Sequence, residues 1–217
     1  MRKSRLNTIC SILALTTLSC TAPPRQEQIQ HNQPHTVSTP SQLLPCPDYD
    51  NPVGLKIDKT FPSVQFPNVD WEPVNIKSHC GSKAVLVVSA TEWCGSCLVE
   101  FDYLAQTAEA WKSRGVEVYY TIFENGASQP ANAETLLIFE DYMFDIYGSI
   151  PFRVLADPTS LLPRSLAGRV TLPVGWLLDE TMTVREFSEG TNASMISRWV
   201  EDLLQAKALS DTDEDAR

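Results

Sequence analysis

The stretch AVLVVSATEWCGSC, residues 84–97, decides the fold of this 217-residue chain. Its first half, Ala84 to Val88, is a continuous apolar run rich in β-branched side chains, which is typical of a strand buried on both faces. Thr91 to Cys94 are predicted to form the loop after this strand, and a helix is predicted to begin at Cys94. Two cysteines separated by two residues therefore lie where a buried strand passes into a helix.

The residues after the cysteines continue this pattern. Apolar side chains recur at the three- and four-residue spacings of a helix at Leu98, Phe101, Leu104, Ala105, Ala108 and Trp111. Gly115 ends the predicted helix, and a second strand is predicted over Val116 to Phe123. A strand, a helix and a second strand in this order form a βαβ unit with parallel strands.

The rest of the domain is predicted from the same periodicities. A helix is expected from about Ala133 to Tyr147, and a strand over Phe152 to Ala156 leads into Asp157-Pro158, a turn that favours the start of a helix. Leu177-Leu178 and Val184 to Phe187 predict an antiparallel hairpin around Asp179-Glu180-Thr181, and Ala193 to Ala208 a closing helix. Upstream, an N-terminal extension with short strands is expected at three apolar clusters, Leu55 to Ile57, Phe61 to Phe66 and Val74 to Ile76.

The N-terminus has the composition of an export signal. Basic residues at positions 2, 3 and 5 precede the apolar stretch 9–18, and Ser19-Cys20 follow, so residues 1–19 are predicted to be a signal peptide. A cysteine directly after a small residue resembles the lipobox of bacterial lipoproteins, which implies lipidation of Cys20. Thr17 stands where such signals usually carry leucine, so cleavage nearby by ordinary signal peptidase is the alternative. A retained membrane anchor is disfavoured because the apolar run is short.

Four segments are therefore expected: the signal peptide 1–19, a flexible linker 20–44 rich in Pro, Gln, Ser and Thr, a domain 45–209, and an acidic tail 210–217. The formal charge of −10 falls to −13 without residues 1–19. This charge disfavours nucleic-acid binding, and membrane attachment would rest on the lipid alone. No apolar run beyond residue 20 is long enough to span a bilayer, which excludes a multi-pass membrane protein.

The two cysteines at the start of the helix predict a redox site. The N-terminus of a helix offers unpaired N–H groups and the positive end of the helix dipole, and both stabilise a thiolate at Cys94. Cys97, one turn further along, lies close enough to attack a mixed disulfide between Cys94 and a substrate. Trp93 is expected to shield one side of this site, and Gly95 to permit the tight turn.

The sequence WCGSC after a valine-rich strand resembles the active site of the thioredoxin superfamily, whose usual motif is WCGPC. The resemblance runs from about Lys83 to Leu204 and implies a thioredoxin-like fold with a central mixed sheet flanked by helices. Such proteins carry a cis-proline facing the cysteines, and Pro173, directly before an apolar strand, matches it. The backbone of Leu172 would then pair with an extended substrate. A trans proline before an edge strand is the alternative.

The layout also resembles the periplasmic redoxins of the TlpA type, with a leader, an N-terminal extension and a helical insertion at about Asn125 to Ile150. Ser96 replaces the proline that tunes the reduction potential in this superfamily, so the direction of electron flow stays open. Many thioredoxins have a buried acid that assists the resolving cysteine. Glu92 and Glu100 lie near in sequence, and each is expected to be a solvated acid on a helix face.

The other cysteines are expected to be structural. Cys10 lies in the leader and Cys20 is the lipidation candidate, which leaves four cysteines and three possible pairings. Redox logic favours Cys94 with Cys97 as the catalytic pair and Cys46 with Cys80 as a structural disulfide, because exported proteins meet oxidising conditions. A relay in which Cys46 or Cys80 exchanges with the active pair is the alternative.

Metal and cofactor chemistry are not expected. His31 and His35 lie in the linker and His79 adjoins Cys80, so no histidine follows the catalytic pair, as zinc or copper sites would require. Leu98 stands where covalent haem attachment needs a histidine.

Two other functions compete with disulfide exchange. Peroxide reduction is one, because Thr91 supplies the Thr-x-x-Cys pattern of peroxiredoxins, although Val87 and Val88 occupy the stretch where their upstream proline stands. A non-catalytic binding module, with Cys94 and Cys97 as a mere staple, is the other. The sequence favours an exported thiol-disulfide oxidoreductase, lipid-anchored on the periplasmic side of a bacterial envelope. Its partners would be protein thiols or disulfides and, if it acts as a reductase, a membrane redox donor.

Overall fold

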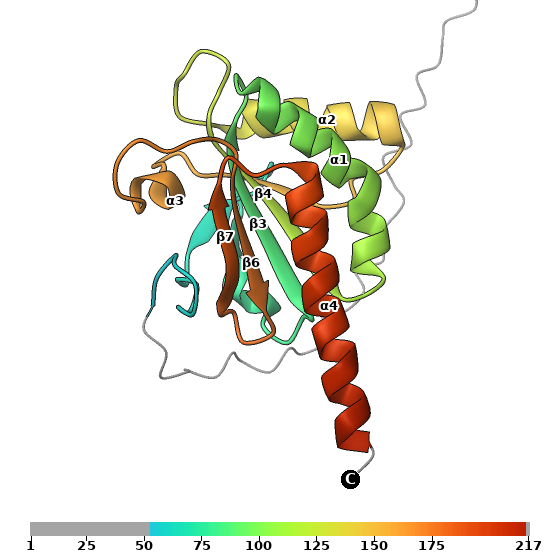
Figure 1. Ribbon diagram of the computed structural model, residues 1–217. Coiled ribbons are helices and arrows are strands. Elements are labelled where there is room, and N and C mark those ends of the chain that lie inside the picture. The colour runs from blue at the N-terminus through green and yellow to red at the C-terminus, as the bar shows by residue number, and fades with distance from the viewer. Residues whose placement is uncertain (1–52, 216–217) are drawn as a thin grey trace, which may run out of the picture. The chain divides into compact units, whose positions relative to one another are not determined.

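A computed structural model of the chain describes residues 53–215, and all of them belong to one of two units into which the chain divides, 40–217. Figure 1 shows its helices and strands. The predicted signal peptide 1–19, Cys20, the linker 20–44 and Cys46 lie outside the described residues.

The centre of the domain is a five-stranded sheet in the order β5-β4-β3-β6-β7. Its strands are β3 (Ala84–Thr91), β4 (Val116–Glu124), β5 (Arg153–Ala156), β6 (Val174–Asp179) and β7 (Val184–Glu189). β3, β4 and β5 run parallel, whereas β6 and β7 run antiparallel to their neighbours. Every residue of β3 is buried. The predicted mixed sheet, with its central strand covered on both faces, is confirmed.

Three helices cover one face of this sheet: α1 (Gly95–Lys112), α2 (Ala133–Tyr147) and α4 (Ala193–Asp215) (Figure 1). Phe101 of α1 lies at the centre of their core, with its ring centroid 4.9 Å from those of Tyr120 and Phe139 and 5.2 Å from that of Phe152. These edge-to-face contacts join α1, β4 and α2. The helical insertion predicted between β4 and β5 is therefore packed into the domain.

The N-terminal extension and the short helix α3 (Leu161–Arg164) contribute to the core on the other face. The extension contains β1 (Gln65–Pro67), β2 (Pro73–Asn75) and the 3-10 helix η1 (Ile76–His79). The strand expected at Leu55 to Ile57 is absent from it, because the backbone turns there: the Lys59 N–H donates to the Lys56 carbonyl at 3.1 Å. The Leu55 carbonyl accepts a hydrogen bond from the buried indole of Trp176 at 3.0 Å, which holds this turn against the core.

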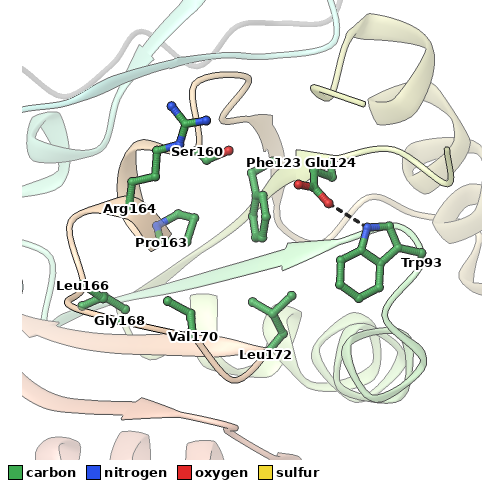
Figure 2. A pocket seen from close by; sticks show the side chains of 10 residues that line it. All are labelled: Trp93, Phe123, Glu124, Ser160, Pro163, Arg164, Leu166, Gly168, Val170 and Leu172. Atoms are coloured by element: carbon green, nitrogen blue, oxygen red, sulfur yellow. Dashed lines mark hydrogen bonds between the residues drawn. The ribbon is translucent and has the colours of Figure 1, made fainter. Parts of the chain in front are cut away.

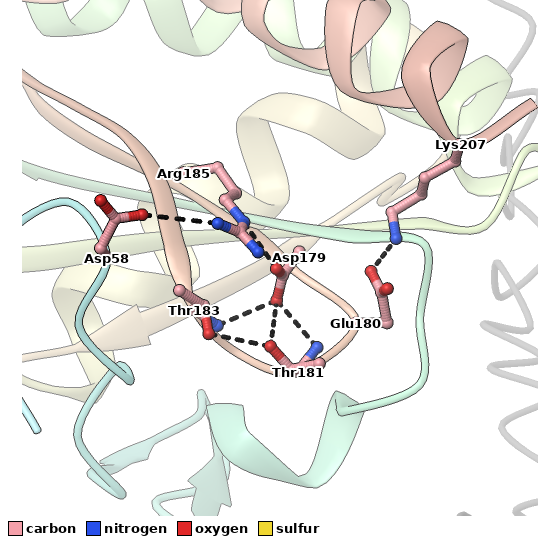
Figure 3. Close-up of polar contacts among 7 residues, drawn as sticks. All are labelled: Asp58, Asp179, Glu180, Thr181, Thr183, Arg185 and Lys207. Atoms are coloured by element: carbon pink, nitrogen blue, oxygen red, sulfur yellow. Dashed lines mark hydrogen bonds and ion pairs between the residues drawn. The ribbon is translucent and has the colours of Figure 1, made fainter. Parts of the chain in front are cut away.

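The closing helix α4 continues to Asp215, beyond the predicted end at Ala208. No glycine or proline interrupts the acidic residues at its end, so the helical backbone continues. Lys207 of α4 forms an ion pair with Glu180 in the β6–β7 turn (Figure 3). Among residues 53–215, no helix is long and apolar enough to cross a membrane.

Asp179 fixes the β6–β7 turn (Figure 3). Its Oδ1 accepts hydrogen bonds from the backbone N–H groups of Thr181 and Thr183, at 2.8 and 3.0 Å, and from the Thr181 hydroxyl at 2.7 Å. Its Oδ2 accepts from Arg185 Nε at 2.7 Å, and Arg185 also reaches Asp58 of the extension. Burial alone would raise the pKa of Asp179, but these hydrogen bonds together lower it below its usual value.

We therefore expect Asp179→Asn to destabilise the domain by about 2 kcal/mol at neutral pH, since it removes charge-assisted hydrogen bonds. A lowered pKa in the folded state stabilises the protein above the unfolded value of about 3.9, and this contribution is lost as the pH falls. Urea unfolding between pH 3 and 7 measures both effects. The exposed Asp202→Asn is the control, and an equal change in both variants would contradict the assignment.

Candidate active site

Cys94 and Cys97 form a disulfide at the start of α1, with their Cα atoms 5.2 Å apart. Cys94 is the N-cap residue of α1, and its backbone is extended because the helix begins only at Gly95. Its sulfur accepts a hydrogen bond from the Cys97 N–H at 3.2 Å and lies 3.3 Å from the Ser96 hydroxyl. Cys94 is 7% exposed and Cys97 0%, so only Cys94 has a surface open to solvent.

The loop before β6 contains Leu172 and Pro173, which are expected to lie beside the substrate. The Leu172–Pro173 peptide bond is cis. The Pro173 carbonyl accepts from the Thr191 N–H at 3.0 Å and from the Thr191 hydroxyl at 3.3 Å, and the Thr171 carbonyl accepts from the Gly190 N–H at 2.9 Å. The connection between β7 and α4 thus holds this loop in place.

Trp93 and Leu172 line one pocket, of about 480 Å³ (Figure 2). Phe123 and Val170 add to its apolar wall, and the segment around α3 closes the other side. The half-exposed Trp93 side chain is held by a hydrogen bond from its indole Nε1 to Glu124 Oε2, at 2.9 Å. The pocket is therefore built from residues far apart in the sequence, and an indole fixed beside Cys94 forms one of its walls.

Glu100 is buried, which corrects the expectation that it is a solvated acid. Its side chain is 2% exposed, and its Oε1 accepts a hydrogen bond from the Thr191 hydroxyl at 3.1 Å. Its Oε2 has no hydrogen-bond partner among the described residues. Burial raises the pKa of Glu100 to about 7, although the bond from Thr191 opposes this rise. A carboxyl group that titrates near neutral pH thus lies on the buried face of α1.

The helical spacing explains this burial. Glu100 lies three residues after Cys97 and four before Leu104, and both of these face the core. This spacing predicts a core position for Glu100, whereas the general preference of acidic side chains for water predicts an exposed one. The expectation for Glu92 was wrong in another way. Glu92 precedes α1, and its half-buried carboxylate accepts a hydrogen bond from the Gly126 N–H at 2.8 Å.

Tyr120 connects β4 to the first turn of α1. Its hydroxyl donates to the Cys97 carbonyl oxygen at 2.9 Å. Burial and the charge of Glu100 raise the pKa of Tyr120 well above its usual value. Tyr120 therefore stays neutral and holds the backbone of Cys97, whereas Glu100, three residues after Cys97, has a pKa of about 7.

The remaining predicted residues lie elsewhere. Cys80 is disulfide-bonded, but Cys46 lies outside the described residues, so their pairing stays a prediction. Thr91 is buried, and its hydroxyl has no hydrogen-bond partner within the described part of the chain. In residues 53–215, no three His, Cys, Asp or Glu side chains gather as metal ligands.

Comparisons with known proteins agree with this architecture. A family model described as the AhpC/TSA family matches residues 57–187. No curated protein matches the chain. A structure from Chlorobium tepidum described as a thiol:disulfide interchange protein DsbE has 21% identity and a TM-score of 0.56, and the match covers 70% of this chain and 99% of that one.

Two other solved structures are similar. The thioredoxin domain of a thiol-disulfide oxidoreductase from Bacteroides vulgatus has 17% identity and a TM-score of 0.54, over 70% of this chain and 99% of that one. A yeast mitochondrial 1-Cys peroxiredoxin has 15% identity and a TM-score of 0.54, over 75% and 80%. At these identities the similarities show the thioredoxin-like fold.

Proposed function

The chain belongs to the AhpC/TSA family, and from this premise we propose that it is a thiol-disulfide oxidoreductase that exchanges disulfides through Cys94 and Cys97. The observation that carries the proposal is the hydrogen bond from the Cys97 N–H to the Cys94 sulfur at the N-terminus of α1. In the reduced protein this donor and the helix dipole favour a thiolate at Cys94. Cys94 is also the only one of the two that solvent reaches.

The first step is attack of the Cys94 thiolate on one sulfur of a substrate disulfide. A bond forms between Cys94 and that sulfur, the substrate S–S bond breaks, and the other sulfur leaves as a thiolate that takes a proton from water. Trp93 and Leu172 line the pocket into which the substrate chain on either side of its cysteine can pass. The product of this step is a mixed disulfide.

The second step uses the buried cysteine. Cys97 gives its proton to the Glu100 carboxylate and attacks the Cys94 sulfur, which releases the substrate thiolate and forms the Cys94–Cys97 disulfide. Glu100 suits this role because Cys97 has no exposed surface and because a carboxyl with a pKa of about 7 is a proton acceptor near neutral pH. The reverse sequence would transfer the disulfide to a substrate dithiol.

Catalysed reduction of insulin by dithiothreitol tests this function. The precipitation of the insulin B chain is expected to begin much earlier with the full-length protein than without it. A time course equal to the uncatalysed one, obtained with protein whose Cys94–Cys97 disulfide is reduced by dithiothreitol, would contradict the proposal.

Peroxide reduction has less support. Val87 and Val88 occupy the stretch where peroxiredoxins carry their upstream proline, and Cys94 is paired with Cys97 in a disulfide. If Cys94 and Cys97 formed only a structural disulfide in a non-catalytic module, the buried Glu100 with its pKa near neutral would have no functional role. Glu100 therefore favours disulfide exchange over a non-catalytic staple.

We also propose that the protein is exported and anchored by lipid on the periplasmic side of the envelope, where protein thiols or disulfides and a membrane redox donor would be its partners. The signal-like residues 1–19 and Cys20 support this location. Radiolabelled palmitate is expected to label the full-length protein in an exporting bacterial host. Cys20→Ala should abolish the labelling, and undiminished labelling of that variant would overturn the anchor.

A further inference from the structure

A groove of about 310 Å³ lies between α1 and α2, and two of its lining residues, Glu92 and Leu98, flank the cysteine pair in the sequence. Phe101 and Phe139 form its floor, whereas Leu98 and Ile138 stand on its two rims. A segment lying in this groove would therefore pass close to the cysteines. The groove contributes to none of the steps described above.

The rims of the groove carry several exposed apolar side chains. On α2, the side chains of Ile138, Tyr142 and Ile146 recur every four residues and are exposed, so they form one stripe along the helix. Leu98 and Val99 of α1 are exposed as well. Exposed apolar side chains that gather along one groove mark a place where another molecule can bind.

The same surface is acidic. Glu134, Asp141 and Asp145 are exposed on α2, at spacings that place them in a row beside the apolar stripe, and α2 contains no lysine or arginine. Asp102 lines the groove, and its Oδ1 accepts hydrogen bonds from the Tyr142 hydroxyl at 2.8 Å and the Tyr147 hydroxyl at 3.1 Å. This carboxylate is thus fixed at the seam.

The second carboxylate of the groove lies at the end near Cys94. It belongs to Glu92, which is held by the Gly126 N–H. Apolar side chains between fixed negative charges are complementary to an apolar side chain flanked by positive charges. A second copy of the chain would bring like charges together on this surface, and so would an anionic membrane.

We propose that the groove between α1 and α2 binds a segment of the substrate protein in which an apolar side chain is flanked by lysine or arginine. The proposal rests on the proposed function, since it identifies the class of substrate that the disulfide-exchange site receives. The groove would hold this segment next to the substrate cysteine and so raise the rate at which Cys94 attacks it.

The experiment uses the reduced full-length protein and two synthetic peptides. Each peptide carries one cysteine in a mixed disulfide with 2-mercaptoethanol; in one peptide the neighbouring residues are leucine and lysine, and in the other leucine and glutamate. The second-order rate of peptide-thiol release is measured at low salt. Neutral 2-hydroxyethyl disulfide reports the basal reactivity of the cysteines, because its rate does not depend on the charge of the groove.

The variants come in matched pairs. Ile138→Ser removes an apolar rim, and Ile57→Ser is its control, because both isoleucines are 50% exposed. Asp141→Lys with Asp145→Lys reverses two charges of the acidic row on α2 beside the groove. Glu109→Lys with Asp202→Lys makes the same change of net charge at exposed positions on α1 and α4.

The wild type is expected to reduce the lysine peptide about 10-fold faster than the glutamate peptide, a typical effect of electrostatic complementarity. The charge-reversed variant should lose this preference, and Ile138→Ser should slow both peptides several-fold. Neither control should change these rates, and all variants should reduce 2-hydroxyethyl disulfide as fast as the wild type.

Equal rates for the two peptides, or equal effects of the groove variants and their controls, would overturn the docking proposal and leave the oxidoreductase standing. A wild-type dimer that Ile138→Ser converts to a monomer, or binding to phosphatidylcholine vesicles that Ile138→Ser abolishes, would also overturn it by assigning the groove another occupant. Absence of any reaction with 2-hydroxyethyl disulfide would instead overturn the proposed function, and the docking proposal with it.

Discussion

Replacing Cys94 by serine is expected to lower the rate of disulfide reduction by about 1000-fold or more, because a hydroxyl at this position is neither ionised nor nucleophilic near neutral pH. Cys97→Ser is expected to have a different effect. This variant should react once with a substrate disulfide and then stay as a mixed disulfide, since the group that resolves it is missing. Mass spectrometry of the protein after reaction with glutathione disulfide distinguishes the two variants.

The two variants control each other. Each lacks the Cys94–Cys97 disulfide, so any loss of stability that comes from the missing bond is common to both. The proposed roles predict a glutathione adduct on Cys97→Ser and none on Cys94→Ser. An adduct on both variants, or on Cys94→Ser alone, would contradict the assignment of Cys94 as the nucleophile.

Replacing Glu100 by glutamine is expected to slow the release of substrate from the mixed disulfide by about 100-fold, a typical effect of losing a general base. The wild-type release rate should rise with pH through an inflection near 7, where Glu100 ionises, and this inflection should be missing from the variant. The first step should be unaffected, because Cys94 already has its stabilising donor.

The same substitution should stabilise the fold above pH 7. An acid whose folded pKa is raised from 4.5 to about 7 holds its proton in the folded state while the unfolded chain loses it, so stability falls as the pH rises between these values. Glutamine keeps an acceptor for Thr191 and removes this cost, which amounts to about 3 kcal/mol.

Glu109→Gln, at an exposed position on the same helix, is the control for Glu100→Gln. Lower activity combined with higher stability is the signature of an acid held in the core for its chemistry. A Glu100→Gln protein that is less stable at pH 8 and keeps the wild-type pH profile would show that Glu100 has a packing role alone.

The sequence predicted the central elements of the fold because local patterns determine them. The β-branched run Ala84 to Val88 is β3, and the apolar spacing after Cys94 is α1. The cysteine pair could be placed at a helix N-terminus from these two patterns alone. Gly148, with φ of 69°, ends α2 at the predicted boundary, because only glycine adopts this conformation freely.

Features that depend on contacts between distant segments could not be predicted. The burial of Glu100 agrees with its helical spacing, but its hydrogen-bond partner Thr191 lies far along the chain. The pocket beside Trp93 needs residues from β4 and from the segment that follows β5. The segment at Leu55, predicted to be a strand, forms a turn whose Leu55 carbonyl accepts a hydrogen bond from the distant Trp176 indole. Each of these features depends on tertiary contacts rather than on the local preference of the sequence.

Cys94 and Cys97 are proposed to form a redox pair that cycles, and a redox titration of the full-length protein shows whether they do. The protein is equilibrated in dithiothreitol buffers of graded ratio, its thiols are trapped by alkylation, and its fold is followed by circular dichroism. We expect a reversible transition with the slope of a two-electron couple, about 30 mV per tenfold change in ratio, and an unchanged fold. A pair that resists reduction, or a domain that unfolds when the pair is reduced, would contradict it.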